Sequence, residues 1–236
     1  MSEGHVSIQM YDLAGADPAV RFSPYCWRIR MALAHKGLEV ETIPWRFRDK
    51  EAIAFSGQGL VPVLRDGETV VHDSWAIADY LDKRYADRPA LMDGAQGRAL
   101  ASFTRHFSQM VFSPIALKAV LLDIYEAIDA GDRDYFRKSR EARVGKTLEA
   151  FVIGEDEARA LMKPALAPMR ALLQEQAFVN GDAPAFADYC LFGGFAWVRG
   201  VSRKQLLEAD DPVYAWRERM LDLFDGLARK APAVGA

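Results

Sequence analysis

The chain has 236 residues, of which half are apolar and 27% are charged, and its formal net charge is -3. This length allows one large or two modest domains, and the composition is that of an ordinary soluble protein. The small negative charge excludes a general attraction to nucleic acid or anionic lipid, and no uninterrupted apolar run approaches the roughly 20 residues of a membrane span.

Short β-like runs alternate with helical ones over about the first 90 residues. Asp66-Gly67, between two β-branched runs, is typical of a two-residue hairpin turn. The first two strands flank a crossover helix and should therefore be parallel. The expected elements are strands at 6–13 and 38–45, helices at 24–36 and 74–85, and a hairpin at 61–73.

Helical periodicity dominates after residue 90. A long helix is expected from 96 to about 126, with a kink at Ser113-Pro114 because proline removes an internal hydrogen bond. Further helices are expected at 133–151, 155–176, 186–199 and 212–228. The sequence thus predicts an α/β domain at 1–86, a linker at 87–94 and an all-helical domain at 95–236.

The stretch "RFSPYCWRIR" resembles the Cys-Pro-Tyr-Cys of a thiol redox enzyme, with Ser23 in the place of the first cysteine. Serine before Pro24 is also a favourable helix start, because serine caps helices and proline suits their first position. Cys26 could be a reactive thiol or an inert buried residue. Only Cys190 accompanies it, and two cysteines are too few for a disulfide scaffold. With no signal peptide at the N-terminus, a cytoplasmic location is expected.

Two further motifs each have an ordinary structural explanation. Pro62 precedes an expected strand, where a missing N–H does no harm. Asp73 and Ser74 open an expected helix, where either side chain could cap free backbone N–H groups. Such a helix start also binds anions.

The chain resembles the glutathione transferase superfamily over nearly its whole length. The motifs that carry the resemblance are "SPYC" after the first strand, "LVPVL" before the hairpin, "HDSWAIADYL" after it and "GDAPAFADY" in the helical half. This resemblance implies a thioredoxin-like domain followed by a helical-bundle domain, and glutathione as the co-substrate. "SPYCWRIRMALAHKG", "DSWAIADYLDKRY" and "LDLFDGLARK" are most similar to the serine-type group of bacterial lignin β-etherases and fungal fuA-class transferases. One departure is Ala185, which replaces the Ser, Thr or Asn that normally pairs with Asp188 in a reciprocal cap.

The resemblance implies a role for each glutathione-site motif. Ser23 would donate a hydrogen bond to the glutathione sulfur and favour its thiolate. Pro62 would follow a cis peptide bond, with the Val61 backbone pairing with the cysteinyl part of glutathione. Ser74 would bind the γ-glutamyl carboxylate, and Asp73 would meet its ammonium group or hold the loop.

The glycine carboxylate of glutathione requires a cation. The stretch "WRFRDK" offers Arg46, Arg48 and Lys50. Arg46, closest to the strand end, is the expected ligand, with the Gln58 amide nearby.

The expected reaction is the attack of glutathione thiolate on a hydrophobic, aromatic electrophile, and β-aryl ether cleavage is the most specific candidate. Arg105, Gln109 and Phe112 on the long helix are expected to line the substrate pocket; alternatively, Arg105 and Gln109 belong to a solvated or dimer-interface stripe. The resemblance also implies a homodimer.

Two other functions stay open: a glutathione-dependent thiol oxidoreductase using Cys26, and a non-catalytic carrier of glutathione and aromatic ligands. The four histidines are scattered and lack the spacing of metal ligands. The sequence has no serine-elbow motif, and no stripe of basic residues accompanies the aromatic residues. We therefore expect no metal, no protein-only triad and no nucleic-acid partner.

Overall fold

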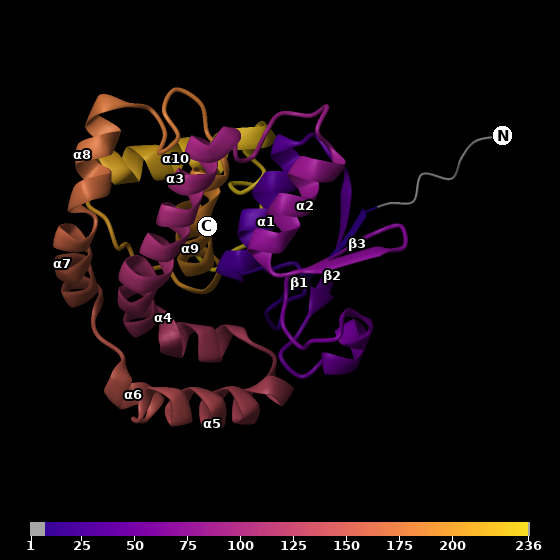
Figure 1. Cartoon of the computed structure of the whole chain (residues 1–236). Helices are drawn as coiled ribbons and strands as arrows, with labels where there is room; N and C mark the ends of the chain where they lie inside the picture. Colours follow the sequence, from indigo (N-terminus) through magenta and orange to yellow (C-terminus); the bar gives the residue numbers. More distant parts are fainter. Residues whose placement is uncertain (1–7, 236) are drawn as a thin grey trace.

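The computed structural model describes residues 8–235. A thioredoxin-like domain with a four-stranded sheet comes first, and a helical domain follows it (Figure 1). This is the order of domains that the sequence predicts.

The sheet has the strand order β2-β1-β3-β4. β1 and β2 are parallel, as expected for strands joined by a crossover helix, whereas β3 is antiparallel to both of its neighbours. Gly67 adopts a φ of 61° in the tight turn between β3 and β4, a conformation that glycine reaches without steric cost. The strands are β1 (Ile8–Leu13), β2 (Val40–Trp45), β3 (Val63–Asp66) and β4 (Thr69–His72).

The helices of this domain begin at the positions that the sequence indicates. Ser23 caps α1 with Pro24 at its first position, and Asp73 caps α2. The helices are α1 (Pro24–His35), the 3₁₀ segment η1 (Lys50–Ser56) and α2 (Ser74–Arg84).

Two of the long helices expected in the second domain are each broken in two. At the first break, Gly145 ends one helix with a φ of 70°, and Thr147 caps the next helix. The second break is at Leu166, between Pro164 and Pro168, where proline cannot supply the helical N–H. After α4 the elements are η3 (Ala130–Asp132), α5 (Arg133–Val144), α6 (Leu148–Phe151), α7 (Glu155–Ala165), α8 (Ala167–Glu175), α9 (Phe186–Val201) and α10 (Pro212–Gly226).

The long helix of the second domain begins at Gly94 rather than at residue 96 and contains an irregular turn. It consists of α3 (Gly94–Phe107), the π-helical turn η2 (Ser108–Phe112) and α4 (Ser113–Ala127). The Ser113 hydroxyl donates to the Ser108 carbonyl at 2.8 Å. The irregularity predicted at Ser113-Pro114 is therefore a π-helical turn that directly precedes these residues.

Continuous from 94 to 127, this helix is long and apolar enough to cross a bilayer by length and composition alone. The sequence analysis did not anticipate this, because charged residues interrupt the apolar run. In the structure the helix packs against α9, which places it in the core of the helical domain.

The two domains meet chiefly where α1 packs on α9 (Figure 1). Gly193 lies at the closest approach, because a Cβ atom built there would be 2.2 Å from the Pro24 carbonyl oxygen. Nearly all of α9 is buried, including Cys190, which packs in the core. The start of α1, and with it Ser23, is thus held against the helical domain.

Asp188 anchors the start of α9 without the usual cap partner. Its carboxylate accepts hydrogen bonds from the backbone N–H groups of Val179, Asn180 and Ala185, and from the Trp216 indole. With alanine at 185 the reciprocal half of the cap is missing, as predicted, and the Trp216 indole adds a tertiary bond.

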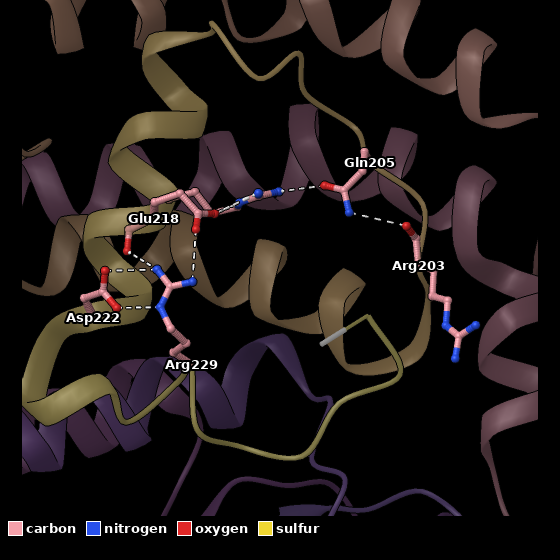
Figure 2. Close-up of polar contacts among 6 residues, drawn as sticks. Arg203, Gln205, Glu218, Asp222 and Arg229 are labelled. Carbon is pink, nitrogen blue, oxygen red and sulfur yellow. Dashed lines mark hydrogen bonds and ion pairs between the residues drawn. The ribbon is translucent and has the colours of Figure 1, made fainter.

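The end of the chain folds back on α10. The backbone leaves helical geometry at Leu223, and Phe224 and Asp225 have positive φ values of 54° and 57°, so the regular helix ends before residue 228. The Arg229 guanidinium then binds the carboxylates of Glu218 and Asp222 (Figure 2).

Candidate functional site

The three motifs expected to hold glutathione lie at one end of the sheet. Tyr11 in β1 faces Val63 in β3, and Val63 faces His72 in β4. The Tyr11 carbonyl lies 4.0 Å from the Cys26 sulfur in the first turn of α1. Since residues 61–62 directly precede β3 and residues 73–74 directly follow β4, the folded sheet brings them together with Ser23.

The Ser23 hydroxyl caps α1 and lies beside the Cys26 thiol. Its Oγ accepts a hydrogen bond from the Cys26 N–H at 3.2 Å, which is the capping role. That bond uses an oxygen lone pair and leaves the hydroxyl proton, which in this structure is within reach of the Cys26 sulfur. Ser23 is 3% exposed, so only a small face of the residue meets solvent.

The Cys26 thiol lies inside the core, and its side chain is fully buried. Burial raises the pKa of this thiol well above its ordinary value, and the negative charge of Asp12 raises it further. A buried thiol with a raised pKa is a poor nucleophile, because the thiolate is the reactive form. The environment of Cys26 therefore does not favour the oxidoreductase interpretation.

The peptide bond between Val61 and Pro62 is cis, as the resemblance led us to expect. Within residues 8–235, neither the N–H nor the C=O of Val61 is hydrogen-bonded to another residue. An extended ligand lying along this loop could therefore pair with both groups.

Asp73 and Ser74 occupy the start of α2. Asp73 has a φ of 70°, and its Oδ1 accepts from the N–H groups of Trp75 and Ala76 at 2.9 and 3.1 Å. Asp73 thus performs the capping role expected for this pair. Ser74 is the first helical residue and is 4% exposed, with its hydroxyl at the positive end of the helix.

The cations of the "WRFRDK" stretch point to different parts of the molecule. Arg46 donates to the Ala16 carbonyl at 3.1 Å and lies 3.7 Å from the Asp129 carboxylate. Arg48 donates to the Gly131 carbonyl at 3.2 Å. Both arginines thus contact segments outside the loop that precedes Val61.

Lys50 reaches that loop. Its ammonium group donates to the Gly59 carbonyl at 2.5 Å and lies over the Trp45 ring. Gln58, in contrast, folds back on its own turn, where its amide donates to the Leu60 carbonyl and accepts from the Leu60 N–H. Lys50 rather than Arg46 therefore lies beside the loop that precedes Val61, and the role expected for Arg46 stays a prediction.

The predicted substrate-pocket residues fall into different environments. Phe112 is fully buried, with its ring 4.5 Å from the Phe195 ring and against Gly194. It is a core residue and does not line a pocket, which corrects the prediction. Gln109 is half-buried, but the π-helical turn changes the helical phase, so the expected α-helical spacing from Arg105 does not hold.

Arg105 remains beside the site. Its guanidinium lies over the ring of Trp75, the residue after Ser74, at 4.4 Å from the ring centroid. Sequence reasoning did not assign Trp75 to the site, although its position directly after Ser74 was an available signal.

Among residues 8–235, no group of three or more His, Cys, Asp or Glu side chains is arranged to hold a metal ion.

Models of known families match most of the chain. Residues 18–97 match the glutathione S-transferase N-terminal domain, and residues 99–224 match the glutathione S-transferase C-terminal domain.

Curated relatives match over shorter stretches. Glutathione S-transferase Z1 of Arabidopsis thaliana is 40% identical over 78 residues, which is 31% of this chain and 35% of that protein. Glutathione S-transferase 1 of Dianthus caryophyllus is 29% identical over 137 residues, 56% of this chain and 62% of that protein. The matched segment thus spans about a third of the first relative and less than two thirds of the second.

Solved structures are similar over nearly the whole chain. Glutathione transferase GSTFuA3 from Phanerochaete chrysosporium has a TM-score of 0.75 and 27% identity, covering 93% of this chain and 92% of its own. A glutathione S-transferase of Ceriporiopsis subvermispora, in complex with glutathione, has a TM-score of 0.79 and 24% identity, covering 96% and 99% of the two chains. Because these two domain models together match most of its residues, the chain belongs to the glutathione S-transferase family.

Proposed function

We propose that this protein joins the thiolate of glutathione to an electrophilic carbon of a hydrophobic, aromatic substrate. The observation that carries the proposal is the Ser23 hydroxyl, which accepts from the Cys26 N–H and has a proton to donate to a ligand. It stands at the N-terminus of α1, where the partial positive charge favours an anion. An unperturbed thiol has a pKa near 8.5, so stabilising the thiolate raises its reactive fraction at neutral pH.

The surrounding groups suit the rest of glutathione. The unpaired N–H and C=O of Val61 would bind the cysteinyl backbone, and the start of α2 at Ser74 would bind the γ-glutamyl carboxylate. Lys50, whose ammonium group lies at the loop before Val61, would bind the glycine carboxylate. The Ceriporiopsis relative was solved with glutathione, which supports the same ligand here.

β-Aryl ether cleavage is the most specific candidate reaction. The thiolate would attack the carbon that bears an aryloxy group, a C–S bond would form, and the C–O bond would break. The aryloxide would leave with the electron pair and take a proton from water. The resemblance of the α1 and α2 motifs to the serine-type group that holds the β-etherases supports this candidate.

A titration of bound glutathione tests the central claim. We expect the ultraviolet absorbance of the thiolate to appear at a lower pH in the complex than in free glutathione. Unchanged ionisation with intact binding would instead favour a non-catalytic carrier. Incubation with aryl ethers, epoxides and activated aryl halides, followed by mass spectrometry for glutathione adducts, identifies the electrophile class.

A homodimer is part of the proposal. Several large apolar side chains are exposed on the small domain and the long helix, and a shared interface would cover them (Phe55, Leu60, Phe103, Met110). Light scattering at micromolar concentration should give the mass of two chains, and a persistent single-chain mass would reject the dimer.

A further inference from the structure

Arg28 is a buried cation without a counter-charge. It lies on α1, five residues after Ser23, and is 1% exposed. Its Nη2 donates to the Ser108 hydroxyl at 3.5 Å, while its Nε and Nη1 have no hydrogen-bond partner within residues 8–235. It forms an ion pair with none of the carboxylates in this part of the chain, whereas many other arginines do.

Arg105 is a second arginine that pairs with no carboxylate among residues 8–235. It is half-buried, its Nη2 lies 3.1 Å from His106 Nε2, and its Nε is buried without a hydrogen-bond partner. It lies three residues before Ser108, the residue that Arg28 contacts. Arg28 also packs against Gly193 of α9, because a Cβ atom built there would lie 3.2 Å from its Cγ. Through Ser108 and Gly193, Arg28 therefore lies where α1 meets α3 and α9, with Arg105 one helical turn away on α3.

Residues 8–235 provide no anion paired with either arginine. Asp188 is close enough to raise the pKa of the Cys190 thiol, but its carboxylate already accepts hydrogen bonds from four N–H groups and does not pair with either arginine. Keeping a charged group away from water without a partner is costly, and guanidinium groups bind carboxylates in a bidentate geometry.

We propose that Arg28 and Arg105 together bind a carboxylate carried by the electrophilic co-substrate, in the seam between α1, α3 and α9. This inference rests on the proposed function, because it names the acidic subclass of its electrophiles.

Tyr25 covers Arg28 in the ligand-free protein. Its ring lies over the guanidinium at 4.9 Å, and the residue is 39% exposed. The proposal requires this partly exposed ring to move aside, because Arg28 is otherwise closed to solvent.

The test needs a carboxylate on a flexible tether from the glutathione sulfur. Ser23 and Arg28 are five residues apart, which is about 7.5 Å in rise and about 140° around the helix axis. An unbranched chain of about five carbons between sulfur and carboxylate is long and flexible enough to cover such a separation.

Two glutathione conjugates that differ at one end test the proposal. S-(5-carboxypentyl)glutathione and S-hexylglutathione share the glutathione part, and only the first carries a carboxylate at the tail. Calorimetric titration should show that the wild type binds the carboxylate conjugate about tenfold more tightly, since a charge-assisted hydrogen bond contributes on this scale. Arg28→Met and Arg105→Met should each abolish this preference while leaving S-hexylglutathione affinity within about twofold.

Arg98→Met is the matched control. Arg98 lies on the same helix and also contacts the Trp75 ring, but it is paired with Asp79. This variant should keep the tenfold preference. If Arg28→Met does not fold, the half-buried Arg105 carries the same test, because its replacement leaves the α1–α9 contact intact.

The outcomes separate the two levels of the proposal. Binding of neither conjugate by the wild type would overturn glutathione binding itself. Equal binding of both conjugates by the wild type, or a preference that survives both arginine substitutions, would overturn only the carboxylate site. If Arg98→Met loses the preference for the carboxylate conjugate to the same extent, the preference comes from the overall positive charge of this region, and the site is rejected.

Discussion

The phenolic oxygen of Tyr189 lies 2.7 Å from Nδ1 of His35, and this hydrogen bond joins α9 of the helical domain to the last turn of α1. Burial lowers the pKa of His35, and the neighbouring charge of Lys36 lowers it further. Burial also raises the pKa of Tyr189, so the hydrogen bond joins a protonated phenol to a neutral imidazole.

This bond predicts that the fold loses stability in mild acid. Because the folded pKa of His35 is below its unfolded value of about 6.5, the unfolded state binds more protons as pH falls. The contribution is fully present above about pH 6.5 and is lost as pH decreases through the lowered folded pKa.

Urea unfolding at about pH 7.5 and about pH 5 measures the effect. The wild type should lose more free energy of unfolding between the two values than His35→Gln, whose amide accepts a hydrogen bond without titrating. Equal losses in both proteins would remove His35 from the acid response.

Ser23→Ala should lower turnover more than glutathione affinity, because a hydrogen bond to sulfur matters most for the thiolate. The same change removes a helix cap and should reduce stability by about 1 kcal/mol. Thr147→Ala is the control for that loss, since Thr147 caps α6 by accepting from the Ala150 N–H at the same 3.2 Å. Single-turnover rates and urea unfolding would be compared. Unchanged turnover in Ser23→Ala, with chemistry rate-limiting, would remove Ser23 from the mechanism.

Ser74→Ala should weaken glutathione binding by about 1–3 kcal/mol, because it removes a charge-assisted hydrogen bond to the γ-glutamyl carboxylate. Turnover at saturating glutathione should fall much less. Ser139→Ala, on the distant helix α5, is the matched control and should leave both values unchanged. Intact affinity with a lost rate in Ser74→Ala would show that the two ends of the ligand are assigned wrongly.

Gly193→Ala should separate α1 from α9. Alanine normally favours a helix interior over glycine by up to about 1 kcal/mol, but here the added methyl group would meet the Pro24 carbonyl at 2.2 Å. We expect a net loss of about 2 kcal/mol or more in the free energy of unfolding, together with weaker glutathione binding, because Pro24 follows Ser23. Gly154→Ala, where no atom lies within 4 Å of the new Cβ, should leave glutathione binding unchanged and cost at most about 1 kcal/mol of stability, because Gly154 is the N-cap of α7. Wild-type stability in Gly193→Ala would contradict this account of the domain contact.

Cys26→Ala should retain most of the turnover. The thiol is fully buried and its pKa is raised, so it should react with a disulfide reagent only after unfolding in urea. Cys190 is equally buried and serves as the internal comparison. Loss of turnover in a folded Cys26→Ala, or rapid labelling of Cys26 in the native protein, would restore the oxidoreductase interpretation.

Local patterns were sufficient wherever one short segment decides its own structure. Ser23 with Pro24 begins α1, Asp66-Gly67 turns the hairpin, and Asp73 caps α2, because each depends on hydrogen bonds or dihedral angles within a few residues. The helix starts at Ser23 and at Asp73 could therefore be located from the sequence alone.

Tertiary packing decided the features that depend on distant partners. Arg46 and Lys50 are four residues apart and equally charged, yet Arg46 contacts Ala16 and Asp129 while Lys50 reaches Gly59. Phe112 is as apolar as a pocket residue, but α9 covers it at Gly194. In the sequence, Arg28 looks like an ordinary solvent-exposed arginine of a helix, and only the packing of α3 and α9 against α1 buries it. Sequence alone thus determined which residue types stand at each helix start, whereas burial and partner choice came from how the two domains meet, since long side chains take their contacts from whichever segments the fold brings near.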